Sequence, residues 1–429
     1  MILYDELRAL ERPIRVGLVG AGFMGKGIVE VLESAPGMEV VAVADIDIKR
    51  ATGCFEAVGL SRYRKIENAA DGRGLSWPEE RAVTEDHRVI PELEGIDMVI
   101  EATGIPEVGA EVAFRSIMNR KHVGMLNVET DVTCGYYLAR LAEGAGVVYT
   151  VCSGDEPAAV KELCDFARTL GFTVVACGKG KNNPLDLSAD PDSLATRAAS
   201  MGLNPRMLTE FVDGTKTMVE MSAVANSCGF TIDRRNMHGP AASVEELAGV
   251  FCLEKEGGIL SREGVVDYAV GDVAPGVFAV VRHHGRIVNE TLRYLKVGEG
   301  PCHLLYRPYH LTNIEVPVSV GTACLYKKPV LRTASAPTTE VITLAKKDIK
   351  EGETVDEIGG FSSRGGIERY SVAEDEGLLP LGLSTGAKLK RDVKKGDPMR
   401  YDDVELPDSL LLHLRGLQDW LCGSKKKRG

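Results

Sequence analysis

The chain has 429 residues, so two or three domains are expected, because single domains usually hold about 100–200 residues. Its 51 basic and 62 acidic residues give a net charge of −11, which argues against a nucleic-acid-binding protein. No run of about 18 apolar residues occurs, and the charged N-terminal segment lacks the apolar core of a signal peptide. We therefore expect no membrane interaction, a cytoplasmic location and a solvated basic tail at Lys425–Arg428. Ten scattered cysteines without a Cys-x-x-Cys pair indicate reduced thiols, not a disulfide framework or a zinc site.

A glycine-rich turn follows the first predicted strand. Residues 15–20 form an apolar strand, residues 26–33 a helix, and residues 39–44 a second strand that ends at Asp45. Between the first strand and the helix, Gly20-Ala21-Gly22-Phe23-Met24-Gly25 matches the G-x-G-x-x-G pattern of dinucleotide-binding turns, and Asp45 stands at the distance that the pattern requires. We therefore predict that NAD or NADP contacts Gly20, Gly22, Phe23, Met24 and Gly25, with Asp45 on the ribose. Asp45 favours NAD, whereas the nearby Lys49 and Arg50 suit the 2′-phosphate of NADP.

The alternation of strand and helix continues to about residue 153. Strands at 96–101, 122–127 and 146–151 and a helix at 136–143 predict a Rossmann fold, a doubly wound parallel α/β sheet, over residues 1–153. The turn after the strand at 96–101 carries Thr103 and Gly104, which are candidates to contact the nicotinamide, because ligands of such sheets bind at this edge. The alternative is an ordinary strand-to-helix turn. Residues 61–92 interrupt the alternation and predict an insertion, either a plain surface loop or a segment that covers the cofactor or reaches a partner subunit.

Residues 154–330 are predicted to form an α+β catalytic domain that also mediates oligomerisation. Asp155 and Glu156 precede a helix at 158–170 and are expected beside the nicotinamide, although acids are also ordinary at the start of a helix. After a strand at 172–176, a glycine-rich turn at 178–184 carries Lys179, Lys181 and Asn182. Two lysines around a flexible turn suit a phosphate or carboxylate, or polarise a carbonyl; the alternative is a solvated turn.

A second polar group follows in the same domain. Asp213, Lys216 and Glu220 have helical spacing and are expected to share one face, with Asn226 after them; the alternative is a salt-bridged surface helix.

The end of this domain carries an arginine and a histidine close together. Strands at 277–281 and 287–290 are predicted to pair, and a helix is predicted at 316–326. Between them, Arg307 suits a bidentate clamp on phosphate or carboxylate. His310 suits acid–base chemistry near neutral pH, unless it is structural.

Residues 329–337 read as a linker before a region of short strands and turns, beginning with a strand at 340–345. The phrase Asp348-Ile349-Lys350 returns as Asp392-Val393-Lys394, with Leu379-Pro380-Leu381-Gly382-Leu383 between the two. This order of motifs resembles the SAF domain, a small β-clip fold, over residues 338–408. Residues 409–429 then form a C-terminal tail.

Several motifs together resemble a known family. Gly20–Gly25, Glu101–Gly104 and Asn127–Thr130 are similar to the NAD-binding domain of homoserine dehydrogenases, although Val128 stands where those enzymes usually carry lysine. With Gly154–Pro157, Tyr306–His310 and the SAF-like segment, residues 13–408 resemble the 1-deoxy-D-xylulose 5-phosphate reductoisomerase-like oxidoreductases. The resemblance implies conversion of 1-deoxy-D-xylulose 5-phosphate to 2-C-methyl-D-erythritol 4-phosphate with NADPH, a step of isoprenoid biosynthesis. It also adds Asn127 to the cofactor contacts.

The leading hypothesis is an NAD(P)-dependent oxidoreductase that acts on a small phosphorylated ketose or polyol. The predicted substrate-binding residues are Lys179, Asn182, Asn226 and Arg307. The predicted catalytic residues are Asp155, Lys181, Asp213, Lys216, Glu220 and His310. The acids among them would handle protons, or would hold a divalent metal ion if the reaction includes an isomerisation, although no ligand spacing demands one.

Two alternatives stay open. A homoserine dehydrogenase-like enzyme would turn over aspartate semialdehyde and need no phosphate group on its substrate. A non-catalytic sensor would bind NAD or NADP tightly without turnover. A homo-oligomer is also expected, because middle domains of this type often pair across a sheet.

Overall fold

The computed structural model describes residues 2–77, 79–182, 185–333 and 335–424. The predictions that concern Asn183, Pro184 and the basic tail Lys425–Arg428 lie outside the described residues. The chain divides into two compact units, each built from separated segments. The first holds the residues up to Ala158 together with Leu311–Arg332 and Ser409–Gly423, and the second holds Ala159–His310 and Thr333–Asp408. This division differs from the predicted domain boundaries, because residues 311–332 and 409–423 return to the first unit.

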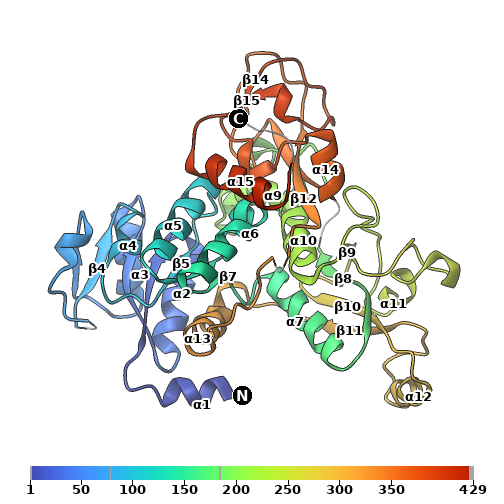
Figure 1. Ribbon diagram of the computed structural model, residues 1–429, viewed down its shortest axis with the longest axis horizontal. Coiled ribbons are helices and arrows are strands. Elements are labelled where there is room, and N and C mark those ends of the chain that lie inside the picture. Colours follow the sequence, from blue (N-terminus) through green and yellow to red (C-terminus); the bar gives the residue numbers. More distant parts are fainter. Residues whose placement is uncertain (1, 78, 183–184, 334, 425–429) are drawn as a thin grey trace. The chain divides into compact units, whose positions relative to one another are not determined.

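The first unit is built around a parallel sheet, of which β4, β5 and β7 are labelled in Figure 1. Its described strands have the order β3-β4-β2-β1-β5-β6-β7. These strands are β1 (Ile14–Val19), β2 (Met38–Ala44), β3 (Tyr63–Lys65), β4 (Arg81–Thr84), β5 (Met98–Glu101), β6 (His122–Met125) and β7 (Tyr149–Val151). The helices are α1 (Ile2–Arg8), α2 (Phe23–Ser34), α3 (Ile48–Ala57), α4 (Val89–Glu92), α5 (Pro106–Met118), α6 (Val128–Ala145), α13 (Val316–Tyr326) and α15 (Leu410–Leu421), with short 3-10 turns η1 (Ala69–Gly72) and η3 (Thr312–Glu315). Helix α7 (Glu156–Thr169) begins in the first unit and continues into the second.

Apolar strands covered on both faces account for this sheet. Strand β2 is buried along its whole length, as expected for a parallel strand with helices on either side. One apolar cluster joins the sheet to α1, α2, α3 and α13, and a second cluster joins it to α4 and α5. Alternate residues of β5 enter the two clusters, which therefore lie on opposite faces. The predicted doubly wound Rossmann sheet is confirmed.

Residues 61–92 contribute to the sheet, so the prediction of an inserted loop is wrong there. Strand β3 pairs with β4, and β4 pairs with β2, all in parallel. The signal in the sequence is weak because β3 has 3 residues and β4 has 4. Two predicted helices also begin too late, since α2 starts at Phe23 and α6 at Val128. The start of α6 is fixed by Asn127, whose side-chain oxygen accepts a hydrogen bond from Thr130 N at 3.1 Å.

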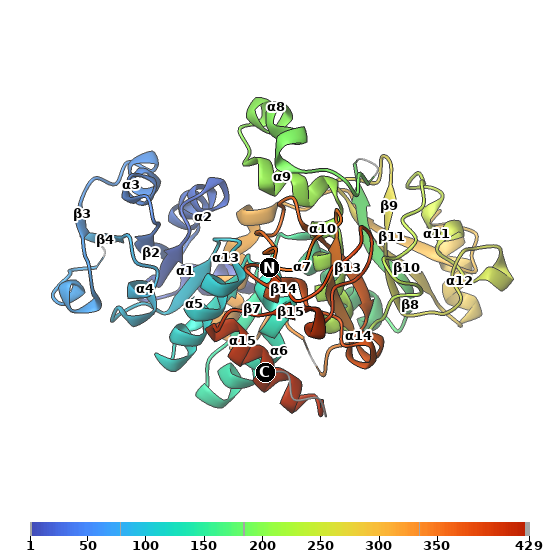
Figure 2. The ribbon, with the colours of Figure 1, turned by 90° about the horizontal axis from the view of Figure 1, so that it is seen from above.

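The second unit contains a sheet whose described strands have the order β11-β10-β8-β9 (Figure 2). Its strands are β8 (Thr173–Lys181), β9 (Val265–Val270), β10 (Val277–Arg282) and β11 (His303–Arg307), followed by the antiparallel pairs β12 (Thr339–Ala345) with β13 (Ser363–Arg369) and β14 (Lys388–Leu389) with β15 (Val404–Glu405). The helices are α8 (Pro191–Met201), α9 (Pro205–Val212), α10 (Thr215–Cys228), α11 (Leu247–Val250), α12 (Arg286–Tyr294) and α14 (Tyr370–Glu376), with 3-10 turns η2 (Glu254–Glu256), η4 (Leu381–Leu383) and η5 (Tyr401–Asp403). One face of the four-stranded sheet packs on α10 and on α7 from Ala159 onward.

Two predictions of local structure in this unit are wrong. Residues 287–290, expected as a strand, lie in α12, and β10 instead pairs with β11. Residues 178–181, expected in a flexible turn, continue β8, so Lys179 and Lys181 lie on a strand. Pairing with β10 on one side and β9 on the other supplies backbone partners along this segment and overrides its glycine-rich composition.

The two repeated phrases of the C-terminal region lie face to face. Ile349 and Val393 form an antiparallel bridge. Lys350 Nζ lies 2.7 Å from Asp392 Oδ2, and Lys394 Nζ lies 2.8 Å from Asp348 Oδ2. Each phrase thus pairs its charges with those of the other. Assignment of residues 338–408 to the SAF domain stays a prediction.

Two general expectations can be compared with the described part of the chain. All ten cysteines lie in it, none of them is bridged, and eight are buried. No described helix combines the length and the apolar character that a membrane span requires.

Candidate functional site

The glycine turn lies between β1 and α2, at the carboxyl edge of the first unit's sheet. Gly20 has a φ of +99°, and a side chain there would press on Ala102 O at 2.8 Å. A Cβ on Gly25 would overlap Gly20 O, so close packing of the helix on the turn requires glycine at this position. Gly22 differs, because a Cβ there would meet no protein atom within 4 Å. Two of the three glycines are thus required by the fold itself. Gly22 is not, so a ligand that approaches its backbone would account for this glycine.

The start of α2 fits the pyrophosphate of a dinucleotide. Its N-cap is Gly22, and no side chain caps the helix. The first backbone N–H groups of a helix have no intrahelical acceptor and carry the positive end of the helix dipole, so an uncapped start attracts phosphate. Phe23 is 73% exposed and Met24 is half-buried, which places both predicted contacts at the surface of the turn.

Asp45 is held in place by the turn that it faces. Its carboxylate accepts a hydrogen bond from Ala21 N at 2.8 Å through Oδ2 and one from Asp47 N at 2.9 Å through Oδ1. A carboxylate has about four acceptor positions, so two are left for the hydroxyls of a ribose. The geometry around Asp45 therefore fits a cofactor with a free 2′-hydroxyl, and the carboxylate would repel a 2′-phosphate.

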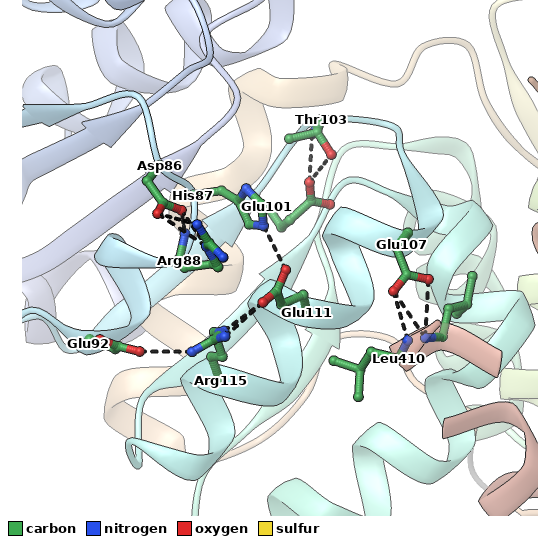
Figure 3. Close-up of polar contacts among 11 residues, drawn as sticks. Asp86, His87, Arg88, Glu92, Glu101, Thr103, Glu107, Glu111, Arg115 and Leu410 are labelled. Carbon is green, nitrogen blue, oxygen red and sulfur yellow. Dashed lines mark hydrogen bonds and ion pairs between the residues drawn. The ribbon is translucent and has the colours of Figure 1, made fainter. Parts of the chain in front are cut away.

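A cleft of about 430 Å³ adjoins Asp45 at the ends of β3 and β4. Asp45 N donates to Thr84 O at 3.1 Å, which places the cleft next to the predicted ribose site. The close-up in Figure 3 shows polar residues of this edge: Arg88 binds Asp86 through two nitrogens, and His87 Nε2 lies 3.0 Å from Glu111 Oε2. One bond within the wall and one to Glu111 of α5 thus hold the wall of the cleft.

Glu101 ends β5 directly beneath the predicted nicotinamide contacts. One of its oxygens accepts from Thr103 N at 2.8 Å and from the Thr103 hydroxyl, as Figure 3 shows. Burial raises the pKa of Glu101 to about 7, against the lowering effect of Thr103. Gly104 follows with a φ of +72° and is exposed. Asn127 is 1% exposed, and its amide donates to Ile105 O at 3.0 Å, so it supports the turn after β5.

Asp131, in the first part of α6, is a second buried carboxyl of this unit. Burial raises the pKa of Asp131 to about 7 as well. Neither Glu101 nor Asp131 forms an ion pair with a described cation, in contrast to the charges of the second unit. Both carboxyls are therefore expected to hold protons in the folded protein at mildly acidic pH.

The second unit gathers several predicted site residues at the end of β8. Lys179 forms a buried ion pair with Glu220 of α10. Lys181 donates to Phe211 O at 2.6 Å. Burial, and then the charge of Lys179, lower the pKa of Lys181 to about 8. A buried lysine with a pKa near neutral is typical of a residue that exchanges protons.

Asp213 joins this cluster from the turn before α10. The prediction that Asp213 shares a helical face with Lys216 and Glu220 is wrong, because Asp213 precedes the helix. Its carboxylate accepts from Thr215 N at 2.8 Å. Its other oxygen lies 2.6 Å from Lys346 Nζ in a pair that is almost fully buried. Burial nevertheless raises the pKa of Asp213. Lys346 was missed in the sequence because it lies 133 positions away, in the region assigned to the small C-terminal domain.

Arg307 and His310 lie at the same end of the sheet. Lys179 pairs with Val277, and Val277 pairs with Arg307, so Lys179 and Arg307 share a face two strands apart, at roughly 10 Å. Arg307 Nη1 lies 3.0 Å from Glu162 Oε2. His310 Nδ1 lies 2.7 Å from Pro275 O, in a loop whose Gly276 O accepts from Gly180 N.

The other predicted residues are placed less decisively. Asn226 is buried, and its side-chain oxygen accepts from Thr338 N at 2.8 Å and Thr339 N at 3.0 Å, so the structure uses its amide to join α10 to β12. Lys216 is half-buried in the first turn of α10, and Asn182 is exposed after β8. Asp155 and Glu156 lie half-buried at the start of α7 in the first unit. The roles assigned to these residues stay predictions.

Part of the chain matches a family of oxidoreductases. Residues 154–316 match the family described as "Oxidoreductase DRL, catalytic domain". No curated protein matches the chain by sequence. Similar solved structures include a probable dehydrogenase from Thermotoga maritima, with 14% identity, a TM-score of 0.42 and coverage of 72% of this chain and 86% of that chain.

Two further solved structures carry a nicotinamide cofactor in their descriptions. GenD2 from gentamicin A biosynthesis, in complex with NAD, is 15% identical, has a TM-score of 0.38 and is covered over 88% of its length by 74% of this chain. The 1-deoxy-D-xylulose 5-phosphate reductoisomerase from Zymomonas mobilis, in complex with NADPH, is 12% identical, has a TM-score of 0.37 and is covered over 82% by 74% of this chain. These likenesses concern the fold alone. The fold and the catalytic-domain match support an oxidoreductase built on a Rossmann-type sheet.

The glycine turn gives a matched pair of variants. In Gly22→Ala, the φ of −72° suits alanine and the new Cβ meets no protein atom, so we expect normal folding but at least tenfold weaker NAD binding, because the Cβ keeps the pyrophosphate away from the backbone. In Gly25→Ala, the Cβ overlaps Gly20 O, so we expect destabilisation of about 1–3 kcal/mol even without cofactor. Urea denaturation and NAD titration measure the two effects. Unchanged NAD affinity in Gly22→Ala would contradict the assignment of the turn.

The two buried carboxyls predict a pH dependence of stability. Because burial raises their pKa values to about 7, the folded state holds protons that the unfolded state has released, so the free energy of unfolding falls as the pH rises from about 4 through 7. In Asp131→Asn and in Glu101→Gln, we expect the free energy of unfolding to fall less over this pH range than in the wild-type protein, by on the order of 3 kcal/mol for each variant. Urea denaturation at a series of pH values between about 5 and 8 measures the difference. Glu94→Gln, at an exposed carboxylate, is the control, and parallel pH curves for all four proteins would refute the prediction.

Proposed function

We propose that the protein is an NAD(P)-dependent oxidoreductase whose substrate is a small anionic molecule, a phosphorylated ketose or polyol. The observation that carries this proposal is the uncapped glycine turn, open at Gly22 and faced by the fixed carboxylate of Asp45. The match of residues 154–316 to an oxidoreductase catalytic domain supports the reaction class. The anionic character of the substrate is inferred from the cations at the end of β8.

The first unit would hold the cofactor, which supplies or accepts the hydride when bound. The N–H groups at the start of α2 would bind its pyrophosphate, and Asp45 would bind its adenosine ribose. Thr103 and Gly104 would contact the nicotinamide end, with Asn127 holding their turn through Ile105 O. Asp45 makes NAD the preferred form in this proposal.

Lys181 is proposed to exchange the proton that accompanies hydride transfer. A carbonyl oxygen that gains a hydride at its carbon needs one proton, and an ammonium with a pKa of about 8 is largely protonated near neutral pH. Its hydrogen bond to Phe211 O directs the ammonium without removing its charge. In the opposite direction, the neutral amine takes a proton from a hydroxyl.

The ion pair between Lys179 and Glu220 is proposed to fix the charge beside Lys181. Glu220 forms an ion pair with Lys179, and the positive charge of Lys179 is one reason why Lys181 has a lowered pKa. Lys179 and Arg307 share a face and are proposed to attract the anionic group of the substrate. This division leaves proton exchange to Lys181.

The specific reaction proposed for the first test is conversion of 1-deoxy-D-xylulose 5-phosphate to 2-C-methyl-D-erythritol 4-phosphate. It follows from the resemblance of the motifs at Gly20–Gly25, Gly154–Pro157 and Tyr306–His310. Turnover is followed by nicotinamide absorbance with a panel of sugar phosphates, with and without Mg²⁺. Turnover of aspartate semialdehyde instead would favour a homoserine dehydrogenase-like enzyme, and cofactor binding without turnover on any substrate would favour a sensor.

Asp45 is expected to set the cofactor preference. In Asp45→Asn the negative charge is lost, so we expect the ratio of affinities for NAD and NADP to move at least tenfold toward NADP. Titration of the full-length protein with NAD and with NADP measures the ratio. Asp47→Asn removes an exposed carboxylate two residues away and is expected to leave the ratio unchanged. An equal ratio in Asp45→Asn and the wild-type protein would exclude Asp45 as the ribose ligand.

Lys181 is expected to determine the rate and its pH profile. Lys181→Met keeps the length of the side chain but cannot exchange a proton, so we expect kcat to fall about 10²–10⁴-fold with little change in NAD affinity. In the wild-type protein, carbonyl reduction is expected to slow as the pH rises through about 8, and this limb should be absent from the variant. Lys255→Met, at an exposed lysine, is the control. A wild-type rate and pH profile in Lys181→Met would rule out this role.

A further inference from the structure

Arg364 is a half-buried arginine of the second unit that neither the motifs nor the 154–316 match includes. It lies on β13, where the backbone is held by pairing with β12. The next residue, Gly365, donates its N–H to the Thr215 hydroxyl at 2.8 Å, which fixes this part of β13 against the start of α10. The strand that carries Arg364 therefore contacts the start of α10, which directly follows Asp213.

The guanidinium of Arg364 is poorly matched by protein acceptors. A guanidinium offers five N–H donors, and burial lowers the pKa of Arg364. Within the described chain its side chain makes one hydrogen bond, from Nη1 to Gly365 O at 3.4 Å, and no carboxylate lies within ion-pair distance. Its remaining nitrogens are not among the polar atoms sealed from solvent. A cation taken partly out of water without an acceptor is costly, so an arginine with this environment indicates an external anion.

The carboxylate that attracts Arg364 is already engaged. Asp213 acts on Arg364 through its charge. The same carboxylate lies 2.6 Å from Lys346 Nζ and accepts from Thr215 N. Lys346 therefore neutralises Asp213, and the described residues supply no second carboxylate to pair with Arg364.

Lys181 and the strand that carries Arg364 both contact the segment 211–215. Asp213 acts on Lys181 as well as on Arg364, and Lys181 donates to Phe211 O, two residues before Asp213. The Thr215 hydroxyl in turn accepts from Gly365 N, the residue after Arg364. Arginine presents a planar fork of donors that matches the oxygens of phosphate, whereas lysine is the better proton exchanger.

We propose that Arg364 binds the phosphate group of a substrate whose reacting carbonyl lies at Lys181. The inference rests on the proposed function and extends it, because it adds Arg364, in the C-terminal region, to Lys179 and Arg307 as a residue that binds the anionic group. This region would then complete the substrate site of the second unit and not serve only as an appended module.

Titration of the full-length protein with inorganic phosphate tests the proposal, with NAD titrated in parallel. We expect phosphate to bind at least tenfold more weakly to Arg364→Gln than to the wild-type protein, and NAD to bind equally to both. Arg364→Lys keeps the charge but not the fork of donors, so an intermediate loss is expected, and this variant serves if Arg364→Gln does not fold. Lys388→Gln removes an exposed cation from the same region and should bind phosphate normally.

The outcomes separate this proposal from the proposed function. Wild-type phosphate affinity in Arg364→Gln, or acetate binding as tightly as phosphate in the wild-type protein, would overturn the phosphate role of Arg364. In either case, intact NAD binding and substrate turnover would leave the oxidoreductase standing. Loss of NAD binding in the wild-type protein itself would instead refute the proposed function.

Discussion

The structure of the second unit depends on two buried lysines, each of which needs a carboxylate to balance its charge. Lys346 pairs with Asp213 and also donates to Ala189 O and Gly360 O, each at 2.9 Å, so one ammonium joins three separated segments. Removing one partner of a buried pair typically costs about 3–5 kcal/mol, because the other charge stays buried and unpaired. The pair between Lys179 and Glu220 imposes the same constraint on β8 and α10. Together they fix the turn at Asp213, on which the placement of Lys181 and Arg364 depends.

The first unit could be predicted from the sequence because its constraints are local. Gly25 is required by the close approach of Gly20 O five residues earlier, Gly20 itself has a φ of +99°, and the N–H of Ala21 in this turn holds Asp45. Such short-range geometry leaves a readable motif, and the alternation of apolar strands with helices then leads to the parallel sheet. The errors fall on β3 and β4, strands of three and four residues that have too little periodicity to be recognised alone.

The second unit was predicted less well because long-range pairing decides its structure. The segment 178–181 has the composition of a turn, yet it forms ladder hydrogen bonds with strands about 90 and 100 residues later. Residues 287–290 read as a strand, yet they lie in a helix, and β11 takes the place beside β10. Lys346 and Arg364 carry no local signal either, because the residue that each of them interacts with, Asp213, lies more than 130 positions earlier. Single residues such as Lys181 were found by type, whereas their partners required the fold.

The two units respond to pH in related ranges for different physical reasons. In the first, burial without a cation raises the pKa values of Glu101 and Asp131 to about 7, so rising pH forces charge into an apolar interior. In the second, burial beside Lys179 lowers the pKa of Lys181 to about 8, so rising pH removes a charge. Near neutral pH, Lys181 is still largely protonated while the carboxyls of the first unit begin to ionise. The stability of the dinucleotide-binding sheet therefore declines as the pH rises to about 7, whereas Lys181 loses its proton only at higher pH, so the sheet loses stability before carbonyl reduction slows.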